Sequence, residues 1–480
     1  MNTTADNPVY WTARRMLEQL EARRISAREL LDAHVAQQER LATKIKAVVV
    51  TDLERAHRDA IAVDDAQANG REVGALAGLP VTVKDGFDVE HMPASAGNTA
   101  LSGRDKNCGD AELVRRARGA GAVVWGKSNV PFMLGDWQTY NAIYGTTNNP
   151  YDTSRGPGGS SGGAAAALAS GITPLEIGSD IGGSLRIPAS FCGVCSLKPT
   201  WGVLPLRGHI PPLPQHFFEW DLGVAGPMAR DVEDLRLFWN VLSGEKSIPK
   251  KVRGLRIAMW DSDPNFPLAR DVREGVARAA AALEQQGAAV TQIQSPLDTR
   301  PLLITYRWIL ASLLGSGFPE EMRQAIEANR EIDRRTVGTD PDPWSAAFNR
   351  LCCTARFHEV AKAYADRQRL DDRMAGFFEQ YDAILMPVSP VAPFPHDHSE
   401  PFFARQLEVD GKPMSYMTML AWIALATLLR LPALAFPTGL SDAGLPIGVQ
   451  LVGPRHMEAR LFDMTAAAEE VLGGFVPPPL

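Results

Sequence analysis

The chain has 480 residues, of which 45% are hydrophobic and 22% charged, so it can form a large core and is not a disordered protein. Its formal net charge of −7, with no dense cluster of basic residues, argues against a nucleic-acid partner. The N-terminal stretch shows neither the apolar region nor the small-residue cleavage site typical of an export signal, and the longest apolar run, Met417–Leu429, is too short to span a bilayer. We therefore expect a cytoplasmic protein without a membrane partner, in which this run forms a buried helix.

In chain order, predicted helices alternate with predicted strands. Ser26 and Glu29 form a capping box at the start of the first long helix. The other predicted helices cover 53–68, 110–121, 272–286 and 457–472. The predicted strands cover 46–50, 76–85, 122–129, 172–180, 254–260, 289–293, 382–390, 433–439 and 445–453. This alternation predicts an α/β fold with a single large mixed β-sheet covered by helices on both faces, in one domain over residues 1–480.

Two segments interrupt the alternation. Residues 201–220 are rich in proline and aromatic side chains and indicate an ordered loop, whereas residues 306–375 are helical without accompanying strands. Either segment can form a cap over a substrate pocket. Long loops and helical insertions also often serve the fold alone, so both interpretations stay open.

A glycine–serine stretch, GPGGSSGG, begins at Gly156. It lacks the lysine of a P-loop and the third glycine of a dinucleotide fingerprint, which argues against phosphate binding. It does contain the GxSxG pattern of an α/β-hydrolase elbow, with Ser161 as the nucleophile and His396 or His398 as possible partners. Because a turn-rich segment rather than a strand precedes it, the elbow is the weaker alternative.

The five cysteines show no framework spacing. Cys192 and Cys195 form a CxxC pair without the second pair that a zinc site requires. We therefore expect the cysteines to be buried small side chains, and we expect neither a metal nor a cofactor.

Three motifs in order resemble the amidase signature family of serine hydrolases: GLPVTVKD around Lys84, GPGGSSGG around Ser160, and GSDIGGSLRIPASFCGV around Ser184. The resemblance implies that Ser184 is the nucleophile, Ser160 a bridging serine and Lys84 the base. It also implies a cis peptide bond between Gly159 and Ser160. Weaker similarity extends over nearly the whole chain.

The chemistry requires a neutral lysine, because only an uncharged amine can accept a proton from a serine. Burial at the end of an apolar strand would lower the pKa of Lys84 from its reference value of about 10.4, provided that Asp85 points elsewhere. The backbone N–H groups are expected to form an oxyanion hole at Ile181, Gly182, Gly183 and Ser184. We expect supporting roles for Gly159, Ser161, Asp180 and Arg186, with Arg186 bracing the loop.

Aromatic side chains suggest an apolar substrate pocket, with Trp137, Tyr140, Phe217 and Phe218 as candidates, although they can equally be core residues. The expected partner is a small-molecule substrate, first a bulky aromatic or aliphatic amide and second an aryl carbamate or ester. We expect a monomer or homodimer. The alternative is an amidotransferase-type subunit of a multi-protein complex.

Overall fold

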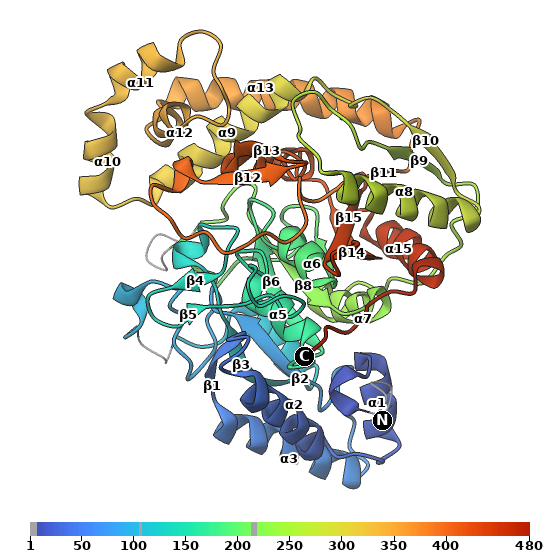
Figure 1. Ribbon diagram of the computed structural model, residues 1–480. Helices are drawn as coiled ribbons and strands as arrows, with labels where there is room; N and C mark the ends of the chain where they lie inside the picture. Colours follow the sequence, from blue (N-terminus) through green and yellow to red (C-terminus); the bar gives the residue numbers. More distant parts are fainter. Residues whose placement is uncertain (1–6, 105–107, 213–217) are drawn as a thin grey trace.

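One mixed sheet of eleven strands forms the centre of the computed structural model, which describes residues 7–104, 108–212 and 218–480 (Figure 1). The strand order is β1-β3-β2-β6-β8-β7-β14-β15-β11-β9-β10. Pairing is parallel from β3 through β2 to β6 and from β11 through β9 to β10, and antiparallel elsewhere. The sheet consists of β1 (Val48–Thr51), β2 (Pro80–Lys84), β3 (Val123–Ser128), β6 (Leu175–Asp180), β7 (Cys195–Lys198), β8 (Val224–Ala229), β9 (Arg256–Met259), β10 (Ala289–Gln292), β11 (Ala383–Pro387), β14 (Ala433–Leu440) and β15 (Pro446–Val452).

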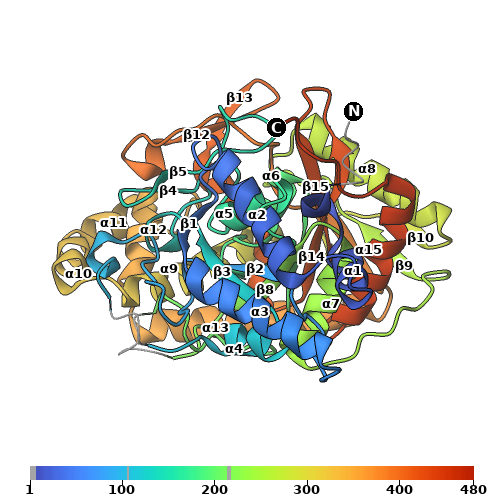
Figure 2. The ribbon, with the colours of Figure 1, turned by 90° about the horizontal axis from the view of Figure 1, so that it is seen from below.

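Helices cover both faces of this sheet, which confirms the predicted fold class (Figure 2). The helices are α1 (Ala13–Glu21), α2 (Ala27–Leu41), α3 (Leu53–Ala68), α4 (Glu112–Gly119), α5 (Gly162–Ala169), α6 (Arg186–Cys192), α7 (Val232–Ser243), α8 (Arg270–Gln285), α9 (Thr299–Ser316), α10 (Glu320–Glu327), α11 (Arg330–Val337), α12 (Ala346–Cys353), α13 (Phe357–Phe378), α14 (Ala424–Leu428) and α15 (Glu458–Leu472). On one face α3 packs on β3, α7 on β8 and α15 on β14; on the other, α6 packs on β14 and β15. Two short hairpins lie outside the sheet, β4 (Tyr140–Asn141) with β5 (Gly145–Thr146) and β12 (Gln406–Val409) with β13 (Lys412–Ser415).

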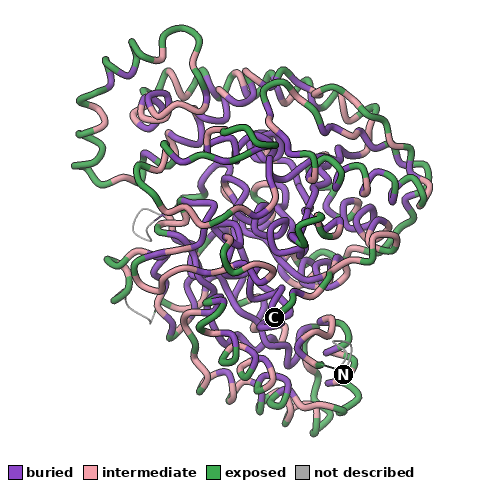
Figure 3. The backbone as a smooth tube through the Cα atoms, in the orientation of Figure 1, coloured by how far each residue is buried: buried purple, intermediate pink, exposed green. Residues whose placement is uncertain are grey.

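The two faces bury separate hydrophobic cores. Alternate residues of β11 divide between them: Ala383 and Leu385 belong to one core, and Ile384 and Met386 to the other. This is the period of two that a strand imposes on its side chains. Burial is concentrated in the sheet and the helices against it (Figure 3). Both faces are therefore apolar, and a charged side chain on a central strand lies far from water.

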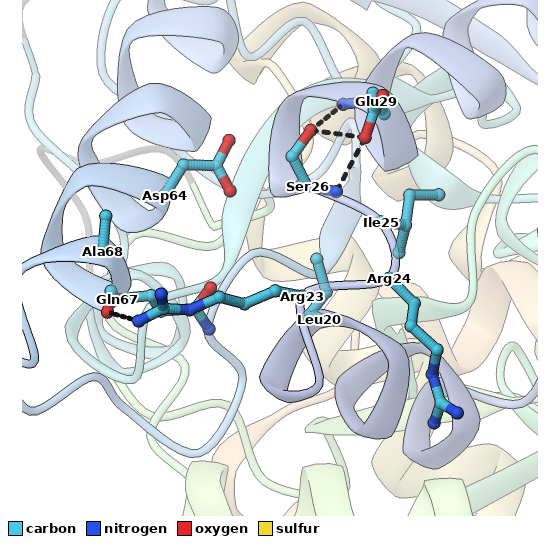
Figure 4. A pocket seen from close by; sticks show the side chains of 9 residues that line it. All are labelled: Leu20, Arg23, Arg24, Ile25, Ser26, Glu29, Asp64, Gln67 and Ala68. Carbon is cyan, nitrogen blue, oxygen red and sulfur yellow. Dashed lines mark hydrogen bonds between the residues drawn. The ribbon is translucent and has the colours of Figure 1, made fainter.

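Local sequence signals predicted most of these elements. The capping box forms as expected: the Ser26 hydroxyl accepts from the Glu29 N–H at 3.1 Å, and the Glu29 carboxylate accepts from the Ser26 N–H at 2.9 Å (Figure 4). The prediction of one helix over Met417–Leu429 is wrong, because this buried run forms a 3₁₀ turn at Tyr416–Leu420 and then α14. Strands β7 and β8 were not predicted.

The segment 306–375 contains helices from the second half of α9 into α13 and no strand, and all of its residues are described. These helices form the upper layer in Figure 1, with α9 packed on α12, α13 and α14. The loop 201–220 is described except for residues 213–217, and it carries cis peptide bonds at Ile210–Pro211 and Pro211–Pro212.

The start of α5 tolerates no side chain at Gly163. A Cβ there would lie 2.3 Å from the Asn129 nitrogen and 2.5 Å from its carbonyl oxygen, which are rigid backbone atoms. We expect Gly163→Ala to lower the free energy of unfolding by about 1–3 kcal/mol, as overpacking does. Denaturant titration measures this. The matched control is Gly376→Ala on the exposed face of α13, which meets no atom within 4 Å and should gain up to about 1 kcal/mol. Equal effects of the two substitutions would contradict the steric argument.

Candidate active site

Lys84, the last residue of β2, is completely buried, and its amine contacts two serines. The Nζ atom lies 2.8 Å from the Ser160 hydroxyl, 3.0 Å from the Ser179 hydroxyl and 3.3 Å from the Ser179 carbonyl oxygen. Ser160 belongs to the glycine–serine loop before α5, and Ser179 to β6, the neighbour of β2. The parallel pairing of β2 and β6 thus brings distant parts of the chain to one amine.

Burial lowers the pKa of Lys84 to about 7, against the opposing effect of the negative charges of Asp180 and Glu176. Burial also raises the pKa of Glu176 to about 8, so this carboxyl is largely uncharged at neutral pH, and Asp180 supplies most of the opposing charge there. The adjacent Asp85 points away from Lys84, as expected, and pairs with Lys127 at 2.7 Å. A substantial fraction of Lys84 is therefore a neutral amine at neutral pH.

The peptide bond between Gly159 and Ser160 is cis, as the resemblance implied. The preceding Gly158 has a φ of +82°, and a Cβ there would lie 2.7 Å from the Cα of Pro188. The glycines thus let the loop pass directly against α6. This close approach holds the Ser160 hydroxyl beside Lys84, where the residue is 1% exposed.

Ser184 lies in the turn between β6 and α6, with 7% of its surface exposed. Its carbonyl oxygen accepts from the Ser161 N–H at 3.1 Å, which joins its turn to the glycine–serine loop. In the described part of the chain its hydroxyl has no hydrogen-bond partner, so the bond between Ser184 and Ser160 that a bridging serine requires is not formed in this structure. The Ser184 hydroxyl is therefore available to another group.

Three of the four expected oxyanion donors are available. The exception is Gly183, whose N–H donates to the Asp180 carboxylate at 2.9 Å, so this part of the prediction is corrected. Across residues 7–104, 108–212 and 218–480, no acceptor binds the N–H groups of Ile181, Gly182 and Ser184. Carboxylates attract backbone donors strongly, which explains the loss of Gly183.

Side chains from distant segments hold the carbonyl groups of the same turn. The Tyr306 hydroxyl donates to the Ile181 carbonyl at 2.9 Å, and the Trp137 indole donates to the Gly182 carbonyl at 2.8 Å. In a trans peptide unit the C=O of one residue and the N–H of the next residue point in opposite directions. Each contact to a carbonyl therefore also fixes the direction of the N–H of the following residue. Tyr306 thereby orients the N–H of Gly182.

Asp180 and Arg186 form a fully buried ion pair with both Asp180 oxygens 3.1 Å from guanidinium nitrogens. Arg186 also donates to Thr427 at 2.7 Å and to the Ile423 carbonyl at 3.2 Å. The positive charge of Arg186 keeps the pKa of Asp180 below its ordinary value, although burial opposes this. The pair ties the Ser184 turn to α14, and among the described residues neither member is hydrogen-bonded to Lys84.

The predicted pocket residues do not form one cluster. Trp137 adjoins the Ser184 turn, whereas Tyr140 stacks on His398 with ring centres 3.7 Å apart. Phe218 is 47% exposed beside Trp220, and Phe217 lies outside the described residues. Of the three predicted pocket residues that the structure describes, Trp137 alone is hydrogen-bonded to the turn.

The elbow alternative finds no support in the geometry. Ser161 is fully buried, and its hydroxyl donates to the Ser179 carbonyl at 3.3 Å. His396 contacts Asn148 and His398 stacks on Tyr140, so neither imidazole reaches Ser161. Residues 147–160, directly before Ser161, contain no strand.

Sequence reasoning missed Ser179, His209 and Tyr306. The His209 Nε2 atom lies 2.8 Å from the Ser179 hydroxyl, so the residue reaches the surroundings of Lys84 from the loop 201–220. Ser179 stands inside a motif quoted for the resemblance, but no local pattern distinguishes His209 or Tyr306 from other polar residues.

Other features of the described residues lie apart from this site. A surface hollow of about 420 Å³ at the junction of α1, α2 and α3 contains none of the predicted site residues (Figure 4). No group of three or more His, Cys, Asp or Glu side chains is placed to hold a metal ion in the described ranges. Of the described helices, none has the length and apolar character needed to cross a membrane.

Comparison with known proteins places this geometry in context. The sequence model described as Amidase matches residues 29–462. The chain is 29% identical to a glutamyl-tRNA(Gln) amidotransferase subunit of Alkaliphilus metalliredigens, over 94% of each chain. Among solved structures, a vestigial protein complex that reveals the evolutionary origins of an s-triazine catabolic enzyme has a TM-score of 0.81 and 28% identity, over 97% of this chain and 100% of the other. The structure of 6-aminohexanoate cyclic dimer hydrolase has a TM-score of 0.78, 26% identity and 97% coverage of each chain.

The lowered pKa of Lys84 predicts a pH-dependent stability. Between about pH 7, where the folded lysine loses its proton, and about pH 10.4, where the unfolded one does, the unfolded state binds more protons. Lys84 should therefore contribute a rise in stability with pH across this window of up to about 1.4 kcal/mol per pH unit. Burial also lowers the pKa of Lys198 to about 7, so Lys84→Met should keep the rise from Lys198 and lack the rise from Lys84, which the difference between the two urea titration series will measure. Lys412→Met on exposed β13 is the control, and a Lys84→Met curve parallel to the wild type would refute the assignment.

Proposed function

The chain belongs to the amidase family, and we propose that it hydrolyses amide-type C–N bonds through an acyl-enzyme on Ser184. The observation that carries this proposal is the fully buried Lys84 amine, 2.8 Å from the Ser160 hydroxyl and with its pKa lowered to about 7. A neutral amine that is hydrogen-bonded to one serine can act as a general base for a second serine through the first. Ser184 lies in the turn after β6, the strand that contains Ser179.

In the proposed reaction, the Ser184 hydroxyl turns toward Ser160 and attacks the substrate carbonyl carbon. The Ser184 proton passes to Ser160 as the Ser160 proton passes to Lys84. The N–H groups of Ile181, Gly182 and Ser184 stabilise the oxyanion of the tetrahedral intermediate. The C–N bond then breaks, and the leaving amine takes the proton from Lys84 through Ser160. Water attacks the resulting ester by the same relay, which releases the acid and restores Ser184.

The substrate we propose is a bulky aromatic or aliphatic amide, with an aryl carbamate or ester as the second candidate. Apolar groups around the Ser184 turn support this: Leu420 approaches Gly182, and Ile423 approaches Gly183. Trp137 adds an aromatic ring at the same turn. We assign the segments 201–220 and 306–375 to the cap over this pocket, since Tyr306 and His209 extend from them to the site.

The second candidate function is that of one component of an amidotransferase complex. It is favoured by the 29% identity to the glutamyl-tRNA(Gln) amidotransferase subunit of Alkaliphilus metalliredigens over 94% of each chain. The purified chain distinguishes the two functions. Release of p-nitroaniline or p-nitrophenol from anilide, carbamate and ester substrates without ATP or a partner supports the free hydrolase, and activity only with both supports the component of a complex.

Covalent labelling tests the roles of the serines and the lysine. A fluorophosphonate probe should label Ser184 in the wild type, and Ser184→Ala should abolish labelling, as peptide mass spectrometry will show. Ser160→Ala and Lys84→Met should each slow labelling by about 10²–10⁴-fold, because each removes the route for the proton. The wild-type rate should rise with pH through about 7 as Lys84 becomes neutral.

Ser161→Ala is the control for these variants, since its hydroxyl binds only the Ser179 carbonyl among the described groups. It should retain labelling at Ser184. Loss of labelling in Ser161→Ala, with Ser184→Ala still reactive, would favour the elbow mechanism instead.

Tyr306→Phe tests the orientation of the oxyanion donors. Burial raises the pKa of Tyr306, so its hydroxyl stays protonated and donates to the Ile181 carbonyl. Without that bond the Gly182 N–H loses its fixed direction, and kcat for the best substrate should fall about tenfold or more with little change in KM. Tyr10→Phe is the matched control, because it loses a bond to the Ser170 carbonyl outside the site. Equal kcat values for the two variants would exclude this role of Tyr306.

A further inference from the structure

His209 is fixed beside the residues that follow Lys84. The Ile210 N–H donates to the Gly86 carbonyl at 2.7 Å, and the Asp88 N–H donates to the Gly208 carbonyl at 2.8 Å. The Phe87 ring stands edge-on to the imidazole with ring centres 4.7 Å apart. The backbone on either side of His209 is therefore hydrogen-bonded to residues 86–88, and the imidazole packs against Phe87.

The two ring nitrogens of His209 have different partners. The Nδ1 atom lies 2.8 Å from the Pro211 carbonyl oxygen, which can only accept, so Nδ1 carries the proton. Burial and the neighbouring Lys84 hold the pKa of His209 down to about 3, so the ring is neutral and Nε2 is an acceptor. The Ser179 hydroxyl, 2.8 Å from Nε2, must therefore donate to it.

The hydrogen bond from the Ser179 hydroxyl to His209 determines which hydrogen bonds Lys84 can form. Because the Ser179 hydroxyl donates its hydrogen bond to His209, it can only accept one from Lys84. The Ser179 carbonyl can also only accept. A neutral amine has two N–H bonds and one lone pair. Both N–H bonds are then directed to Ser179, and the lone pair remains for the hydroxyl of Ser160.

We propose that His209 is a positioning residue that, through Ser179, directs the lone pair of Lys84 to Ser160. The inference rests on the proposed function, in which Lys84 is the base. Without the acceptor on His209, the Ser179 hydroxyl can turn its proton to Lys84 and occupy the lone pair. With His209 in place, Lys84 donates to the Ser179 hydroxyl and carbonyl whether or not it is protonated. Of its three hydrogen bonds, the one with Ser160 alone reverses direction when the proton moves to Lys84.

Two amide substitutions separate this role from a merely structural one. His209→Asn keeps a donor for the Pro211 carbonyl but carries no acceptor as far out as Nε2. His209→Gln extends an amide oxygen to that position. We expect His209→Asn to lower the maximal labelling rate of Ser184 by a fluorophosphonate about 10–100-fold with an unchanged half-saturating concentration, and His209→Gln to retain it within about fivefold. Equal rates for the two variants would overturn the proposal.

The pH profile gives a second readout. In His209→Asn, the limiting rate at high pH should fall while the apparent pKa stays near the wild-type value, because the lysine remains buried. An unchanged limiting rate with an apparent pKa displaced toward 10 would mean that water has reached Lys84 and would contradict the proposal.

A double-mutant cycle completes the test. Once Ser179→Ala has removed the connection, adding His209→Asn should cause no further loss of rate. Losses that multiply would show that His209 acts by another route. If His209→Asn does not fold, as judged by circular dichroism, His209→Leu takes its place in the cycle.

Labelling of the wild type separates a failure of the role of His209 from a failure of the proposed function. Labelling at Ser184 in the wild type, with His209→Asn equally fast, would overturn the role of His209 and leave the proposed function intact. A wild type labelled at another residue would overturn both.

Discussion

Burial of one amine against two serines governs the organisation of this site. Lys84 ends a strand that is covered on both faces, and its Nζ atom lies 2.8 Å from Ser160. Removing an ammonium group from water is costly unless an anion compensates it. Here Asp85, the carboxylate next to Lys84 in the sequence, is paired with Lys127, and the pKa of Glu176 is raised to about 8. The surroundings thus favour the neutral amine, although the charge of Asp180 opposes this.

The turn that carries Ser184 is held by groups from other segments of the chain as well as by Asp180 directly before it. Tyr306, Trp137 and Ser161 bind three of its carbonyl groups, and Asp180 takes the N–H of Gly183. The N–H groups of Ile181, Gly182 and Ser184 have no acceptor among the described residues. A helical segment far along the chain therefore contributes to the geometry of the turn, which connects the proposed cap with the proposed chemistry.

The pattern of strands shows where local signals are sufficient. Strand β2 and helix α3 were predicted from their own residues, because apolar runs and caps encode them directly. Strands β7 and β8 were missed: β7 is four residues long, and β8 contains Gly226 and Pro227 in its interior. Both are strands because β6 and β14 lie on either side of them and supply the pairing. The run Met417–Leu429 was apolar enough for a helix, but packing divides it.

The fold class, the family resemblance, and the candidates Lys84, Ser160 and Ser184 could be predicted from the residues alone, because motifs and periodicity are local properties of a chain. Which polar groups contact the Lys84 amine follows only from the folded chain. Ser179 and His209 reach Lys84 from other segments, and Tyr306 reaches the Ser184 turn from a position 125 residues removed from Ile181. The direction of a hydrogen bond depends on every partner of the donor and the acceptor, and those partners meet only when the sheet has formed.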